Sequence, residues 1–241
     1  MKARRMRRDA VSRSGGMSRP KAALFDVDGT LVDTNYLHAV TWWEAFAQAG
    51  YHPPMADIHR VIGMGSDHML DQLLPADRDR DGDPDVRAAH STLYATYWSR
   101  LRPLPGAAEL LRACKRRGLA VVLASSADEP EFNALRAALD AEDVIDAATF
   151  AGDVKSSKPA PDLVQAALDR VGVSAHEAVF TGDTVWDVRA RQKAGVPCIG
   201  LLSGGTSRDE LTAAGAAEIY PGPADLLTAL RGSLLGGVSD Q

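Results

Sequence analysis

The segment KAALFDVDGTLVD, residues 21–33, is an apolar run that stops abruptly at two carboxylates. Asp26 and Asp28 are two positions apart, and the turn that must follow the apolar run decides whether their side chains meet. Gly29 lets the backbone bend there, so that both carboxylates can face one site. This layout is typical of a nucleophile with an acid/base partner, placed where a first strand ends.

Residues 36–102 show helical patterns without a convincing strand. Apolar side chains recur at roughly helical spacing over residues 38–49, and further helical stretches follow over 55–74 and 84–101. We therefore expect a helical cap domain over residues 36–102. It is inserted into a main domain made of residues 21–35 and 103–241.

After Gly106 the pattern changes to alternating helices and strands. Continuous apolar runs over 119–124, 144–150, 178–181 and 198–202 predict strands, with helices predicted over 107–117, 129–139, 161–171 and 185–194. Strands that are apolar throughout indicate a parallel sheet buried on both faces. The predicted fold class is α/β, a doubly wound, Rossmann-like parallel sheet whose ligand site lies beyond the carboxyl ends of its strands.

Charge is spread unevenly along the 241 residues. Residues 1–20 hold seven basic side chains and one acidic one, a charge of +6. Because the formal net charge of the whole chain is −5, residues 21–241 carry −11. We expect residues 1–20 to form a disordered basic tail, with Met17 as an alternative start of the chain. The acidic body argues against nucleic-acid binding, and no apolar run reaches the roughly 18 residues of a membrane helix. We expect a cytoplasmic enzyme without membrane or nucleic-acid partners; its oligomeric state is left open.

Polar side chains follow the predicted strands. Ser125 and Ser126 end the run 119–124, and Asp183 follows the run 178–181, with Asp187 one helical turn further on. Lys158, before Pro159, opens another helix. Because the carboxyl ends of parallel strands meet at one edge of a sheet, we expect these groups and the two aspartates after the first strand to converge.

Four signatures in this order resemble those of the haloacid dehalogenase-like superfamily, specifically members with a helical C1-type cap, of the phosphoglycolate phosphatase type. They are DVDGT at 26–30, Ser125 after an apolar strand, Lys158 with Pro159, and GDTVWD at 182–187. The resemblance covers nearly the whole chain from Lys21 onward. It implies a phosphatase that acts on a small phosphorylated substrate.

The resemblance assigns the chemistry to the aspartates. Asp26 is the implied nucleophile, giving an aspartyl-phosphate, and Asp28 the acid/base, for which we expect a raised pKa. Mg²⁺ is the implied cofactor, with Asp26, Asp183 and the backbone carbonyl of Asp28 as ligands. Asp187 is expected to bind the ion through water or to orient Asp183.

The remaining signature residues are expected to bind the phosphoryl group. The resemblance implies that Ser125, together with Ser126, donates hydrogen bonds to phosphoryl oxygens. Lys158 is expected to offset negative charge on the nucleophile and the phosphate. In the cap, candidate substrate contacts are Arg60, Ser66, Asp67 and His68.

Other reactions of the superfamily fit less well. True dehalogenases lack the acid at Asp28, and phosphonatases use a cap lysine, whereas residues 35–102 contain none. A sugar phosphomutase of the β-phosphoglucomutase type stays open, because His38 and Trp42 fall where those enzymes carry a His and a Trp. Ser66, however, stands in the segment where they carry a phosphate-binding Arg. We expect His38 to serve packing or hinge motion rather than catalysis.

A phospho-accepting signalling domain is the alternative from another class. Receiver domains also have an acidic Mg²⁺ pocket on a parallel sheet and an aspartate that becomes phosphorylated. They lack a large helical insertion and an acid at the position of Asp28. A phosphatase is therefore favoured over a signalling domain.

Overall fold

Six parallel strands form one sheet in the computed structural model, which describes residues 19–237. The sheet order is β3-β2-β1-β4-β5-β6, which confirms the predicted doubly wound α/β fold. Each predicted strand is present, and β6 is an additional one. The strands are β1 (Ala22–Phe25), β2 (Ala120–Ala124), β3 (Ala147–Thr149), β4 (Ala178–Gly182), β5 (Cys198–Leu201) and β6 (Glu218–Tyr220).

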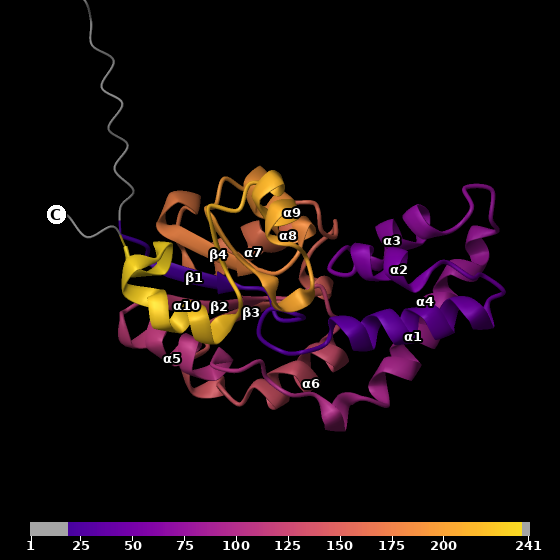
Figure 1. Cartoon of the computed structure of the whole chain (residues 1–241), viewed down its shortest axis with the longest axis horizontal. Coiled ribbons are helices and arrows are strands. Elements are labelled where there is room, and N and C mark those ends of the chain that lie inside the picture. The colour runs from indigo at the N-terminus through magenta and orange to yellow at the C-terminus, as the bar shows by residue number, and fades with distance from the viewer. Residues whose placement is uncertain (1–18, 238–241) are drawn as a thin grey trace, which may run out of the picture.

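Helices cover both faces of the sheet (Figure 1). On one face, Phe25 belongs to a buried cluster with side chains of α5, α6 and α10; on the other, Leu24 belongs to a cluster with side chains of α7, α8 and α9. Neighbours along β1 thus enter different cores, which explains why this strand is apolar throughout. The helices are α5 (Ala107–Arg116), α6 (Glu129–Leu139), α7 (Asp162–Val171), α8 (Val185–Lys193), α9 (Arg208–Ala214) and α10 (Pro223–Ala229).

The chain between β1 and α5 forms a group of helices to one side of the sheet (Figure 1). We call residues 35–102 the helical insertion. It has its own apolar core, in which Trp42, Phe46, Ile58 and Leu70 are buried together. Its helices are α1 (Asn35–Gln48), α2 (Met55–Val61), α3 (Ser66–Leu73) and α4 (Asp83–Ala95).

One expected helix is divided in two. The stretch predicted over 55–74 breaks between α2 and α3, because Gly63 has a φ of 88° and Ile62 is extended. A Cβ atom on Gly63 would lie 2.8 Å from Cγ2 of Thr184, so this turn approaches the loop after β4 closely. The break places a loop of the helical insertion against the edge of the sheet.

The order of the strands reverses at β1, which lies between β2 and β4. A crevice at such a reversal is where doubly wound proteins bind ligands. The predicted tail of residues 1–20 falls outside the described residues except for Arg19 and Pro20. Over residues 19–237, no helix has the length and apolar character to span a bilayer.

Phe180, fully buried in β4 beside Leu24, tests the packing of the sheet. Phe180→Ala should lower the free energy of unfolding by about 3–5 kcal/mol, because the lost ring leaves a cavity between strand and helices. Urea denaturation measures this. Val40→Ala, at an exposed position of α1, should change it by no more than about 0.5 kcal/mol. Equal, small effects at both positions would contradict the described core.

Candidate active site

Three buried carboxylates meet at the carboxyl ends of β1 and β4. Asp26 directly follows β1, Asp183 directly follows β4, and Asp187 lies in the first turn of α8. One oxygen of each carboxylate lies within 4.8 Å of the others. The structure therefore brings together three of the four aspartate side chains predicted from the sequence.

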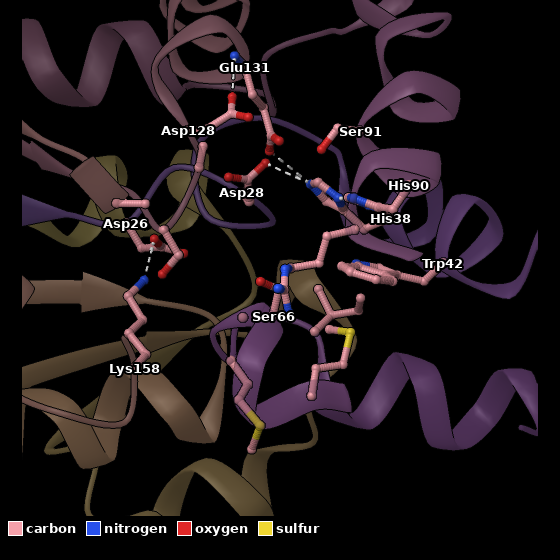
Figure 2. A pocket seen from close by; sticks show the side chains of 18 residues that line it. Asp26, Asp28, His38, Trp42, Ser66, His90, Ser91, Asp128, Glu131 and Lys158 are labelled. Atoms are coloured by element: carbon pink, nitrogen blue, oxygen red, sulfur yellow. Dashed lines mark hydrogen bonds and ion pairs between the residues drawn. The ribbon is translucent and has the colours of Figure 1, made fainter. Parts of the chain in front are cut away.

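Lys158 supplies the positive charge of this cluster (Figure 2). Its Nζ lies 2.6 Å from Oδ1 of Asp26 and 2.8 Å from Oδ1 of Asp187, and its side chain is 1% exposed. Burial disfavours the ammonium, but the two carboxylates outweigh burial and raise the pKa of Lys158. One ammonium beside three carboxylates leaves two negative charges uncompensated.

Burial and the excess negative charge raise the pKa values of two of the carboxylates. Burial, reinforced by the charge of Asp187, raises the pKa of Asp26 well above its ordinary value despite the nearby Lys158. The same two causes raise the pKa of Asp183 to about 7. A buried, oxygen-only donor set with this charge fits a hard divalent cation such as Mg²⁺.

Neighbouring side chains orient two of these carboxylates. Thr30 donates its hydroxyl hydrogen to Oδ1 of Asp183 at 2.6 Å, and Asn35 donates from Nδ2 to Oδ2 at 2.8 Å. The backbone N–H and the hydroxyl of Thr184 both donate to Oδ2 of Asp187, at 3.0 and 2.6 Å. Sequence analysis did not single out these partners, although Thr30 and Thr184 lie inside the quoted signatures.

Gly29 makes the turn after β1 possible. Its φ is 71°, and a Cβ atom there would lie 2.4 Å from the Asn35 side chain and 2.5 Å from Oδ2 of Asp183. Any side chain at this position would displace the carboxylate. The glycine therefore permits both the bend of the chain and its close approach to the acidic cluster.

Asp28 points away from the acidic cluster, toward the helical insertion (Figure 2). Its Oδ1 accepts from the Thr34 hydroxyl at 2.8 Å and lies 3.2 Å from Nε2 of His38, and its Oδ2 accepts from Ser125 Oγ at 3.3 Å. Burial alone would raise the pKa of Asp28, but His38 and Thr34 outweigh it and lower that pKa. The expected raised pKa is wrong for this arrangement, because His38 stabilises the carboxylate.

His38 is thus a neighbour of the predicted acid/base. Burial disfavours its charged form, but the hydrogen bond to Asp28 and the charge of that carboxylate outweigh burial and raise the pKa of His38. Glu131, on α6, places Oε1 3.6 Å from Nε2 of His38, and burial raises the pKa of Glu131 to about 8. Behind them His90 stacks on Trp42, and burial lowers its pKa well below the ordinary value.

A cavity of about 310 Å³ opens between the sheet edge and the helical insertion (Figure 2). The core contributes Asp26, Asp28, Ser126 and Lys158 to its walls. The helical insertion contributes the apolar side chains of Trp42, Ile62, Met64 and Met69 and the polar ones of His38, Ser66, Arg87, His90 and Ser91. A phosphorylated small molecule could therefore reach both predicted catalytic aspartates.

Of the remaining residues that were predicted to contact the substrate, some line the cavity and others do not. Ser125 is fully buried beside Asp28, whereas Ser126 lines the cavity. Of the four candidates in the insertion, Ser66 lines this cavity, but the other three do not. Arg60 is paired with Asp57 and lines a different cavity, Asp67 accepts from Ser157 Oγ at 2.7 Å, and His68 is exposed. Arg60, Asp67 and His68 therefore lie outside the cavity that holds Asp26.

Glu131 gives a pH-dependent prediction for stability. Because its pKa is raised from 4.5 to about 8, the folded protein keeps a proton that the unfolded chain loses, so stability must fall as the pH rises between these values. Glu131→Gln should flatten this decline when unfolding by urea is measured across the range. Glu129→Gln, at an exposed position of the same helix, is the control. An unchanged slope in Glu131→Gln would contradict the assignment.

Comparisons with known proteins agree with this geometry. A family model described as haloacid dehalogenase-like hydrolase matches residues 20–195. Protein SUPPRESSOR OF QUENCHING 1 of Arabidopsis thaliana is 33% identical over 187 residues, which is 75% of this chain but 18% of that protein. The chain therefore spans less than a fifth of the length of this relative.

Two further relatives match along most of their length. Phosphoglycolate phosphatase of Shigella boydii is 28% identical over 237 residues, covering 87% of this chain and 92% of that enzyme. A hydrolase from Pseudomonas syringae superposes with a TM-score of 0.84 at 32% identity, covering 88% and 98% of the two chains. Together with the parallel sheet and the family match over residues 20–195, these likenesses show that the chain belongs to the haloacid dehalogenase-like hydrolase family.

Proposed function

We propose that this chain is a Mg²⁺-dependent phosphomonoester hydrolase that acts on a small phosphorylated metabolite through an aspartyl-phosphate on Asp26. One observation supports this most: Asp26 lines a cavity and lies in a buried cluster with Lys158 and two further carboxylates, those of Asp183 and Asp187. The relatives named phosphoglycolate phosphatase support the same reaction class.

In the first step, the carboxylate of Asp26 attacks phosphorus. Lys158 holds Oδ1 of Asp26 at 2.6 Å, so Oδ2 is the proposed attacking atom. The P–O bond to the alcohol breaks as the bond to Asp26 forms, and Ser126 lies in the cavity wall to bind phosphoryl oxygens. The ammonium of Lys158 favours the ionised form of the attacking carboxylate, against burial, and offsets phosphoryl charge.

The proposed ligands of Mg²⁺ are Asp26, Asp183 and the backbone carbonyl of Asp28, with Asp187 as an orienting or water-mediated partner. When bound, the ion supplies positive charge that lowers the repulsion between the Asp26 carboxylate and the phosphoryl group. Thr30, Asn35 and Thr184 fix the carboxylates from behind. Because these hydrogen bonds already hold the carboxylates, the acidic cluster does not have to rearrange during the reaction.

Asp28 is the proposed acid in the first step and base in the second. Because its own pKa is lowered, Asp28 draws from His38 the proton that it gives to the alcohol oxygen as the ester bond breaks, and it then takes a proton from the water that hydrolyses the aspartyl-phosphate. His38, 3.2 Å away and with a raised pKa, is a positioning residue that holds a proton beside Oδ1 of Asp28. Inorganic phosphate and free Asp26 are the products of the second step.

We also propose that residues 36–102 act as a cap that excludes water from the cavity. Two contacts with the core, one from the α2–α3 loop and one from the first turn of α3, support this. The N–H of Gly65 donates to the carbonyl of Lys158 at 3.1 Å, and Asp67 accepts from Ser157 at 2.7 Å. Opening these contacts would admit substrate without disturbing the acidic cluster.

A sugar phosphomutase is the second candidate, favoured by the contact of His38 with Asp28. That reaction needs a group that grips a second phosphate in the position of Ser66, which is not basic. Incubation with a sugar monophosphate and a catalytic amount of its bisphosphate distinguishes the two. If the sugar phosphate isomerises faster than phosphate is released, the proposed hydrolase is wrong and the chain is a mutase.

Asp26→Asn should reduce phosphate release to the uncatalysed background, because an amide cannot attack phosphorus. Release of phosphate from a panel of monoesters, with Mg²⁺ and with EDTA, measures this. Asp33→Asn, an exposed position in the same segment, should keep wild-type activity and metal dependence. Full metal-dependent turnover by Asp26→Asn would overturn the covalent mechanism.

Asp28→Asn should affect alkyl and aryl esters differently. Hydrolysis of an alkyl phosphate needs a proton on the leaving oxygen and should slow by about 10²–10⁴-fold. p-Nitrophenyl phosphate leaves without a proton, so formation of the aspartyl-phosphate from it should be slowed far less. A rapid burst of p-nitrophenol, followed by slow turnover, is the expected signature. If Asp28→Asn slowed formation of the aspartyl-phosphate equally for alkyl and aryl esters, the role of Asp28 as an acid would be contradicted.

A further inference from the structure

Asp28, His38 and Glu131 form a second cluster of metal-ligating side chains, separate from the acidic cluster around Asp26. One donor atom of each lies within 4.8 Å of the others. Nε2 of His38 lies 3.2 Å from Oδ1 of Asp28 and 3.6 Å from Oε1 of Glu131, so both carboxylates point toward one ring nitrogen (Figure 2). All three side chains line the cavity. One nitrogen and two carboxylate oxygens thus converge at the cavity wall.

The spacing of these donor atoms matches a zinc site. Zn²⁺ binds imidazole nitrogen and carboxylate oxygen at about 2.0–2.2 Å, so the ligand atoms of a tetrahedral site are roughly 3.3–3.6 Å apart. The two N–O distances at His38, 3.2 and 3.6 Å, are close to this spacing. A histidine in the donor set favours Zn²⁺ over Mg²⁺, because Mg²⁺ prefers oxygen ligands. The fourth position would face the cavity and hold water.

Glu131 is the member of this cluster that the proposed hydrolysis leaves unexplained. Its side chain is about nine-tenths buried and points toward His38, yet among residues 19–237 its carboxyl group accepts no hydrogen bond. A buried carboxyl group without hydrogen bonds destabilises a protein unless another partner compensates it. A metal ion would be such a partner, and its binding would displace the protons of His38 and Glu131.

Neighbouring side chains already hold two of the three ligands in place. Nε2 of His90 lies 3.3 Å from Nδ1 of His38, and the rings of His38 and Tyr94 stack with centroids 4.1 Å apart. When Nδ1–H of His38 donates to His90, Nε2 can bind a metal; ligating histidines are commonly held in this way by their other nitrogen. The Thr34 hydroxyl donates to Oδ1 of Asp28 at 2.8 Å and fixes that carboxylate.

We propose that Asp28, His38 and Glu131 bind Zn²⁺ at a second, inhibitory metal site, distinct from the proposed Mg²⁺ site. Zn²⁺ on Nε2 of His38 takes the place of the proton that Asp28 draws from it, and it also binds the Asp28 carboxylate. Protonation of the leaving alcohol then fails, although Asp26 stays free to react. The zinc site rests on the geometry alone, whereas the inhibition rests on the proposed hydrolase.

Zinc binding in excess Mg²⁺ tests the site without turnover. Equilibrium dialysis of the full chain should show a tight site for one Zn²⁺, weakened by at least about 10-fold in Glu131→Gln and in His38→Gln. Glu129→Gln, at an exposed position of α6, should bind Zn²⁺ like the wild type. So should Asp183→Asn, which removes a proposed Mg²⁺ ligand. Wild-type affinity in either Glu131→Gln or His38→Gln, or loss of the tight site in Asp183→Asn, would overturn the inference.

Phosphate release under the same conditions separates the inhibition from the proposed function. Zn²⁺ should inhibit the wild type and Glu129→Gln at the concentration that fills the site. Glu131→Gln, compared with its own rate without zinc, should need at least about 10-fold more Zn²⁺. Undiminished turnover of the wild type with the site filled would overturn the inhibition. A wild type that binds zinc through these residues but hydrolyses no monoester would uphold the site and reject the hydrolase.

Discussion

The contact of the Lys158 ammonium with Asp26 and Asp187 is the interaction on which the acidic site depends. Removing one charge of a buried pair typically costs about 3–5 kcal/mol, because the partner is left uncompensated. Here one ammonium faces three carboxylates, and the excess negative charge fits a hard divalent cation. The fold produces this arrangement because β1 and β4 are neighbours and end at the same edge, which brings Asp26 and Asp183 together. Lys158 lies in the segment before α7.

The other half of the site comes from the helical insertion. Asp28 leaves the acidic cluster and meets His38 on α1, while α4 contributes His90 and Arg87 to the same cavity. In the proposed function, chemistry at phosphorus and contact with the alcohol half fall to different parts of the chain.

The sequence predicted the fold and the acidic cluster well, since apolar runs locate buried strands and parallel strands end at one edge. The rule that parallel strands end at one edge was enough to predict that Asp26, Asp183 and Lys158 converge. The contact of His38 with Asp28, and of Glu131 with His38, depends on how α1 meets α6, for which the sequence carries no periodic signal. That contact reversed the expected pKa shift of Asp28. Arg60 pairs with Asp57 and lies outside the cavity of Asp26, a placement for which the sequence carries no signal.

The most direct test of the central claim, that Asp26 becomes phosphorylated, is mass spectrometry of enzyme quenched with acid during turnover of a phosphomonoester. Peptide mapping should place the phosphoryl group on Asp26, in wild type and at a higher level in Asp28→Asn. A phosphoryl group on another residue would contradict the account, as would phosphate release by an enzyme that never carries the label.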